Sequence, residues 1–155
     1  MVKNISIFDM DGTIIDSSHR QATKPDGTLN LAAWIENATP EKISKDVVLP
    51  LAQQIRKRQK AGDYVLICTA RQMSFADFEF LQDNGICPDK IISRPLGNME
   101  ADGSLKAKQL SKLFNLKQFA KASKIMFDDA ASVRSALRKI GIAVLDPAKI
   151  ARRAA

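Results

Sequence analysis

The amino-acid sequence predicts an α/β fold organised around one doubly wound, Rossmann-like parallel sheet. Two observations lead to this prediction. Short apolar runs occur along the chain and are continuous rather than alternating, which is typical of strands buried on both faces of a parallel sheet. Segments with the spacing of amphipathic helices separate these runs. Because no repeat, low-complexity tract or linker divides the 155 residues, we expect a single domain over residues 1–155.

Five strands are expected from the apolar runs. Each run is short and is bounded by polar or turn-forming residues, as buried strands usually are. In chain order the runs are residues 5–8, 64–68, 90–92, 124–127 and 142–145, and the third is the least apolar.

Four helices are expected where apolar residues recur every three or four positions. The first carries Val47, Val48, Leu51, Ala52 and Ile55 and ends at Gly62. The others carry Phe75, Phe78 and Leu81 on one face, then Leu110, Leu113 and Phe114, and finally Val133, Leu137 and Ile140. These stripes are expected to face the core.

Residues 16–46 interrupt the alternation of strands and helices. They contain the turn signal Pro25-Asp26-Gly27, a possible short helix over residues 31–37 and a helix start at Thr39-Pro40. We expect Trp34 to be a packing anchor that holds this insertion to the body of the domain. His19, the single histidine, is expected to be a surface loop residue.

Composition and charge limit the functional classes. The two cysteines stand apart, no secretory signal precedes them and no apolar stretch reaches the length of a membrane span, so a cytoplasmic protein without a membrane partner is expected. The net charge of +7 is uneven: residues 1–105 hold 12 bases and 14 acids, and residues 106–155 hold 12 bases and 3 acids. Such asymmetry fits a surface for a polyanion, but equally a set of solvated lysines.

The strongest motif, Asp9-Met10-Asp11-Gly12-Thr13, follows the first predicted strand. In a doubly wound sheet, ligands bind beyond the carboxyl ends of the strands, so both carboxylates are expected to enter one crevice. A calcium loop of the Asp-x-Asp-Gly type is excluded, because Arg20 stands where its distal glutamate is required.

Two further predicted strands are followed by residues suited to binding a phosphate group or a cation. Thr69 and Arg71 follow the second apolar run, and a hydroxyl and a guanidinium are natural phosphate ligands. Asp128 and Asp129 follow the fourth run, and adjacent acids at such a place repel one another unless a cation lies between them. Oxygen ligands of this kind favour Mg²⁺.

These motifs, in this order and on these elements, resemble the haloacid dehalogenase superfamily of phosphohydrolases. The resemblance implies that Asp9 is the nucleophile, that Asp11 is the general acid and base, and that Thr69 binds the transferring phosphoryl group. It further implies that the Mg²⁺ ligands are the side chains of Asp9 and Asp128 and the backbone carbonyl of Asp11, and that Asp129 supports the metal site.

The catalytic lysine is either Lys106 or Lys108. We prefer Lys106, because Arg94 and Lys106 keep the spacing found in the phosphatase domain of phage polynucleotide kinases, which this stretch resembles. Thr13, Arg71 and Arg94 are the expected substrate-binding residues.

Members of this superfamily often carry a cap domain, and residues 16–46 are long enough only for a flap. An open site and the basic residues 106–155 favour a nucleotide or a nucleic-acid end as the substrate, and a polynucleotide 3′-phosphatase is one form of this hypothesis. A small-metabolite phosphatase is the alternative, and a phosphate-binding protein without turnover is a third hypothesis. The oligomeric state is left open.

Overall fold

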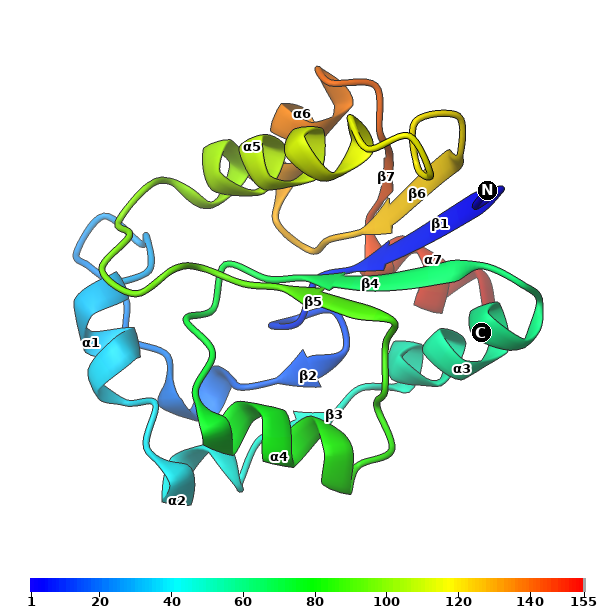
Figure 1. Ribbon diagram of the computed structural model, residues 1–155. Coiled ribbons are helices and arrows are strands. Elements are labelled where there is room, and N and C mark those ends of the chain that lie inside the picture. Colours follow the sequence, from blue (N-terminus) through cyan, green and yellow to red (C-terminus); the bar gives the residue numbers. More distant parts are fainter. Residues whose placement is uncertain (155) are drawn as a thin grey trace.

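A computed structural model describes the backbone of residues 1–154 and the side chains of residues 1–150 (Figure 1). Its centre is a five-stranded sheet in the order β5-β4-β1-β6-β7, and every neighbouring pair is parallel. All five predicted strands are confirmed as β1 (Asn4–Phe8), β4 (Tyr64–Cys68), β5 (Lys90–Ile92), β6 (Ser123–Phe127) and β7 (Ala143–Leu145). The chain builds outward from β1 to one edge and then returns to build the other, which is the doubly wound arrangement.

Helices cover both faces of the sheet (Figure 1). On one face, α5 (Asp102–Phe114) and α6 (Ala131–Arg138) pack over a core that includes Ile7, Leu110 and Leu137. On the other face, α3 (Gln53–Lys60), α4 (Phe75–Asp83) and α7 (Pro147–Ala154) lie over a second core that includes Val65 and Ile67. The strands are therefore buried on both sides, which explains their continuous apolar sequence.

The insertion at residues 16–46, here called the flap, folds into short elements beside the second face. Within the flap lie η1 (Ser18–Arg20), α1 (Leu31–Glu36) and α2 (Pro40–Ile43). At its two ends β2 (Ile15–Asp16) and β3 (Val47–Val48) form an antiparallel pair that closes its base, and η2 (Pro50–Ala52) follows. The predicted helix start is confirmed, since the Thr39 side chain caps α2. Trp34 is buried, with the Arg20 guanidinium of the flap 4.2 Å and the Arg71 guanidinium of the loop after β4 5.7 Å from its ring centroid, so it packs the flap against the body as expected.

The first predicted helix was wrong at its amino end. Val47 and Val48 form strand β3 instead, and the α-helix begins only at Gln53. Pro50 explains the difference, because the residue before a proline is driven into extended backbone, as Leu49 is here with φ −86° and ψ 155°.

The predicted inner face of α4 is confirmed at Leu81 but was wrong at Phe75 and Phe78. Phe75 and Phe78 are 81% and 46% exposed, whereas Phe80 and Leu81 face the core. The helix is rotated because Asp77 is fully buried, where it pairs with Arg71 and closes the capping box with Ser74. A polar contact therefore sets the orientation of this helix.

The last predicted helical stripe is shorter than expected. Helix α6 ends at Arg138, and Ile140 lies beyond it with 41% of its surface exposed. Within residues 1–154, no helix combines the length and the apolar character that crossing a bilayer requires.

Candidate active site

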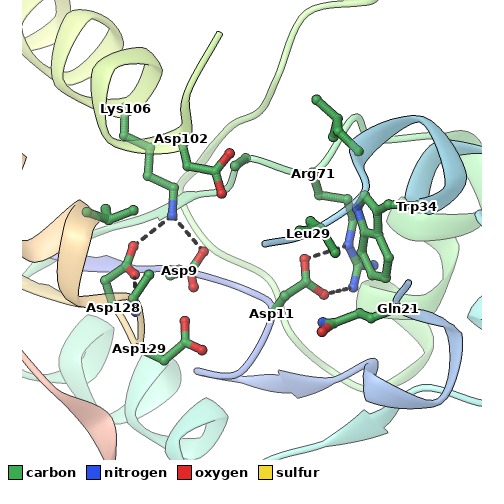
Figure 2. A pocket seen from close by; sticks show the side chains of 14 residues that line it. Asp9, Asp11, Gln21, Leu29, Trp34, Arg71, Asp102, Lys106, Asp128 and Asp129 are labelled. Carbon is green, nitrogen blue, oxygen red and sulfur yellow. Dashed lines mark hydrogen bonds and ion pairs between the residues drawn. The ribbon is translucent and has the colours of Figure 1, made fainter. Parts of the chain in front are cut away.

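The carboxyl ends of β1, β4 and β6 open into a pocket of about 230 Å³ (Figure 2). The loop after β1 brings Asp9 and Asp11 to this pocket, the loop after β4 brings Arg71, and the loop after β6 brings Asp128 and Asp129. Backbone hydrogen bonds extend the sheet to its rim, since the Asp9 amide donates to the Phe127 carbonyl at 2.9 Å. The three strand ends singled out by the sequence therefore do meet.

A tight turn places Asp9 and Asp11 on the same rim. The amides of Thr13, Ile14 and Ile15 all donate to the Met10 carbonyl, at 3.1, 3.0 and 3.0 Å. Gly12 takes φ +78°, a conformation that costs a residue with a Cβ about 1–2 kcal/mol. The glycine of the Asp-x-Asp-Gly sequence is thus required by the backbone conformation, and the two aspartates supply the carboxylates.

Lys106 bridges two of the carboxylates. Its Nζ atom lies 2.8 Å from Asp9 Oδ1 and 2.7 Å from Asp128 Oδ2, and the side chain is almost fully buried. Burial lowers the pKa of Lys106, but the charges of Asp9 and Asp128 outweigh it and raise that pKa above its ordinary value. Lys108 lies on the outside of α5 and pairs with Glu100 at 2.8 Å. Of the two candidate lysines, the structure brings Lys106 to Asp9.

Three carboxylates gather around this lysine. Ligand oxygens of Asp9, Asp128 and Asp129 lie within 4.8 Å of one another. Burial raises the pKa of Asp9 well above its ordinary value and also raises the pKa of Asp129, and the neighbouring Asp128 charge acts in the same direction on both. One ammonium cannot balance three carboxylates, and oxygen donors alone suit a hard cation. These residues therefore fit Mg²⁺.

The glycine after Asp11 contributes to this cluster. A Cβ on Gly12 would lie 2.1 Å from Asp129 Oδ2, so the carboxylate occupies space that only glycine leaves free. Asp129 does not cap helix α6, because the helix begins after Ala130, whose amide donates instead to Asp128 Oδ1 at 3.0 Å. Both aspartates after β6 are thus directed to the site.

The Asp11 side chain belongs to a second cluster, on the flap side of the pocket (Figure 2). Arg71 donates to both Asp11 oxygens through Nε and Nη2, and Ser17 donates to Asp11 Oδ1. The other Arg71 nitrogen, Nη1, donates to Asp77 at 2.7 Å, and Asp46 lies 3.4 Å from Nη2. Arg71 therefore orients the predicted general acid.

Asp46 ties the flap into the same cluster. It accepts two hydrogen bonds from Arg20, both of 2.9 Å, and contacts His19 Nε2 at 2.8 Å. Sequence reasoning did not find Arg20, Asp46 or Asp77, because no local motif marks them. The only signal was Ser74-x-x-Asp77, a pattern that by itself indicates a helix cap.

The remaining predicted site residues differ in their position. Thr13 Oγ1 donates to Asp9 Oδ2 at 3.2 Å, and Thr69 is fully buried with its hydroxyl accepting from the Arg71 amide at 3.0 Å. Arg94 does not line the pocket. Its buried guanidinium donates to the Ala70 carbonyl at 2.7 Å and to Asp102 at 2.6 Å, and so holds the loop between β5 and α5.

Comparison with known proteins agrees with this geometry. The model of the bacteriophage T5 5′-deoxynucleotidase family matches residues 1–153. The 5′-deoxynucleotidase of Escherichia phage T5 is 36% identical over 89 residues, which cover 55% of this chain and 36% of that protein. The chain thus aligns with about a third of the length of this relative.

Three solved structures share the fold. A haloacid dehalogenase-like hydrolase from Streptococcus pneumoniae superposes with a TM-score of 0.67 and 15% identity, over 93% of this chain and 84% of that one. A chain of the Pnkp1/Rnl/Hen1 RNA repair complex superposes with a TM-score of 0.63 and 18% identity, over 94% of this chain and 42% of that one. A phosphoserine phosphatase solved as a phospho-aspartyl intermediate analogue superposes with a TM-score of 0.54 and 13% identity, over 94% of this chain and 86% of that one.

The Rossmann-like sheet, the acidic rim around Asp9 and a family match over nearly the whole chain all lead to the same assignment, and the resemblance inferred from the sequence is confirmed. The chain belongs to the bacteriophage T5 5′-deoxynucleotidase family, and its fold is that of a haloacid dehalogenase-like hydrolase.

Proposed function

We propose that this protein is a Mg²⁺-dependent phosphatase that hydrolyses deoxynucleoside 5′-monophosphates through an aspartyl-phosphate on Asp9. The observation that carries the proposal is the setting of Asp9, whose two oxygens contact Lys106 and Thr13 at the edge of an acidic pocket. A carboxylate held in one orientation beside a cation is suited to attack phosphorus. The name of the phage T5 relative supports the substrate class.

In the first step, an Asp9 oxygen forms a bond to phosphorus while the bond from phosphorus to the 5′ oxygen of the sugar breaks. Asp11, two residues further on the same rim, gives its proton to that leaving oxygen. Lys106 and the Thr69 hydroxyl are assigned to the phosphoryl oxygens, where a positive charge and a hydrogen bond offset the negative charge that moves during transfer.

In the second step, water attacks the phosphorus of the aspartyl-phosphate, and Asp11 takes up a proton from that water. The bond between phosphorus and the Asp9 oxygen breaks, inorganic phosphate leaves and the Asp9 carboxylate is restored. Arg71 and Ser17 hold Asp11 in place for both steps, because they contact its oxygens from the flap side.

Asp9, Asp128 and the Asp11 backbone carbonyl are assigned to hold Mg²⁺, and Asp129 is assigned to support them. The ion, when bound, supplies positive charge that neutralises the phosphate and its carboxylate neighbours. Full activity in excess chelator would exclude this role.

The test compares Asp9→Asn with wild type, by measuring phosphate release from a deoxynucleoside 5′-monophosphate in Mg²⁺. Asparagine has the shape of aspartate but is a poor nucleophile, so turnover should be lost while the thermal unfolding transition persists. Wild-type protein incubated with a ³²P-labelled nucleotide and quenched in acid should retain label, and Asp9→Asn protein should retain none. Equal turnover by both proteins would contradict the covalent mechanism.

A polynucleotide 3′-phosphatase is the second candidate. Two observations favour it. One is the fold shared with a chain of an RNA repair complex, and the other is the presence of exposed lysines within the basic residues 106–155, namely Lys112, Lys117 and Lys121. A screen that runs a 3′-phosphorylated oligonucleotide beside mononucleotides and sugar phosphates separates the two candidates, and sugar phosphates as the best substrates would favour a small-metabolite phosphatase.

A further inference from the structure

The pocket has a second half that the proposed chemistry does not use. The flap contributes Gln21, Leu29, Leu31 and Trp34 to its lining. In Figure 2, Gln21, Leu29 and Trp34 lie on the side of the pocket away from Lys106, Asp128 and Asp129. Leu29 keeps 38% of its surface exposed although it faces this pocket. Leu29, Leu31 and Trp34 together give this side of the pocket an apolar lining, and such a lining suits an apolar group of a bound ligand.

Hydrogen bonds within the flap fix this half of the pocket. Thr23 and Leu29 form an antiparallel bridge across the Pro25-Asp26-Gly27 turn, which holds the Leu29 backbone. Asn30 then caps α1 by accepting from the Ala33 amide at 3.2 Å, so that Trp34 falls on the first turn of that helix. The wall is therefore formed before a ligand arrives, which reduces the entropy lost on binding.

The wall is also joined to the catalytic loops. Arg20 lies over the Trp34 ring and is held by Asp46, whose other neighbour is Arg71. The Arg71 guanidinium lies 5.7 Å from the same ring. The distance between the apolar wall and the phosphate end of the pocket is thus set by buried ion pairs rather than by a free loop.

We propose that Leu29, Leu31 and Trp34 form the subsite for the nucleobase, and that Leu29 is a specificity-determining residue. This inference rests on the proposed function and deepens it. Given the proposed function, a ligand that fills the pocket carries a phosphate near Asp9 and Lys106 and a weakly polar group against Leu29 and Leu31. A nucleoside monophosphate has this form, whereas a sugar phosphate carries hydroxyl groups that leucine side chains cannot satisfy.

Gln21 supplies the polar contact of this subsite. Its side chain lines the pocket, and its amide nitrogen donates to Ser17 Oγ at 3.2 Å. The amide oxygen is an acceptor, and an amide group matches the hydrogen-bonding edges of bases. The flap therefore offers an apolar surface to the base through Leu29 and Leu31, with the buried Trp34 behind them, and an edge contact through Gln21.

The test uses Trp34, the single tryptophan of the sequence, as a reporter placed in the wall itself. Its fluorescence is followed while Asp9→Asn protein, which keeps the ligand intact, is titrated with a 2′-deoxynucleoside 5′-monophosphate or with 2-deoxyribose 5-phosphate. The nucleotide should change the emission and bind at least tenfold more tightly. Leu29→Asn should weaken nucleotide binding roughly tenfold, the scale of one lost apolar contact in a pocket, and affect 2-deoxyribose 5-phosphate much less.

The matched control is Leu116→Asn, which makes the same change at a leucine that is 47% exposed and lies outside the pocket. It should leave both titrations as they are. Equal affinity for the two ligands, or an equal loss for both in Leu29→Asn, would overturn the base subsite. So would an oligonucleotide that binds more tightly than the mononucleotide and is insensitive to Leu29→Asn.

Failure of the proposed function gives a different result. If the nucleotide binds against Trp34 but wild-type protein releases no phosphate, the subsite stands and the phosphatase does not. If wild-type protein hydrolyses both esters with equal kcat/KM, the phosphatase stands and the subsite is refuted.

Discussion

Replacing Arg71 tests whether this residue positions Asp11 rather than binding phosphate as its sequence context suggested. Arg71 is 2% exposed and contacts Asp11, Asp77 and Asp46. Arg71→Met keeps much of the volume of the arginine side chain but removes its positive charge, so that three carboxylates lose this ion-pair partner. Removing one partner of a buried ion pair costs about 3–5 kcal/mol of folding free energy.

The structure places the expected loss near the lower end of that range. Asp77 keeps its bonds from the Ser74 amide at 2.8 Å and hydroxyl at 3.0 Å, and Asp46 keeps both of its bonds from Arg20. We therefore expect about 3 kcal/mol, a large part of the roughly 5–15 kcal/mol that stabilises a domain. Arg71→Lys keeps the charge but cannot reach all three acids, so it should lose less.

The assay is urea unfolding followed by Trp34 emission, with Arg56→Met on the exposed side of α3 as the control. The control should stay within about 0.5 kcal/mol of wild type. Should Arg71→Met prove too unstable to purify, Arg71→Lys carries the test. Its kcat should fall more on alkyl than on aryl phosphates, because a displaced Asp11 protonates poor leaving groups badly. A stability change below about 0.5 kcal/mol in Arg71→Met, or equal losses on both esters in Arg71→Lys, would show that Arg71 does not hold Asp11 in place.

Three further predictions follow from the same site. Asp11→Asn should reduce kcat severely, and more on alkyl than on aryl phosphates; a substrate screen that shows equal losses would remove its role as the acid. Gly12→Ala should raise the Mg²⁺ concentration needed for half-maximal activity, because the new Cβ displaces the Asp129 carboxylate, and unfolding should show a further loss of about 1–2 kcal/mol from its positive φ. If nucleic acid binds the basic residues 106–155, the KM for a 3′-phosphorylated oligonucleotide should rise steeply with salt concentration and in Lys117→Glu or Lys121→Glu. The KM for a mononucleotide should change little.

The sheet and the acidic rim could be predicted because their signals are local. A strand buried on both faces needs a continuous apolar run, and the runs at residues 5–8 and 64–68 have no other simple explanation. The acids that follow β1 and β6 must share an edge, since parallel neighbours end on the same side. The choice between Lys106 and Lys108 could not be made from local signals alone, because both lysines lie on α5. They differ in their contacts, since Lys106 reaches Asp9 and Lys108 pairs with Glu100.

The flap cluster could not be predicted, because its contacts join residues far apart in sequence. Arg71 meets Asp46 across 25 positions and Asp11 across 60, and no spacing rule reports such pairs. The same pairing rotates α4 so that Asp77 faces inward and Phe75 faces solvent, against the apolar pattern. A buried ion pair outweighed hydrophobic periodicity at that helix, which composition and period alone do not reveal.

The two clusters divide the chemistry of the pocket between the sheet and the flap. Lys106 contacts Asp9, so the position of the Asp9 side chain depends on α5 and β6. Arg71, from the loop after β4, and Ser17 of the flap contact Asp11, so the position of the Asp11 side chain depends on the flap as well. Only one residue separates the two aspartates along the chain. A change in the flap, at Asp46 for instance, should therefore disturb proton transfer to the leaving group before it disturbs attack on phosphorus. Because the flap also carries the proposed base wall, that wall and the predicted general acid Asp11 are joined through the same ion-paired residues, Arg20, Asp46 and Arg71.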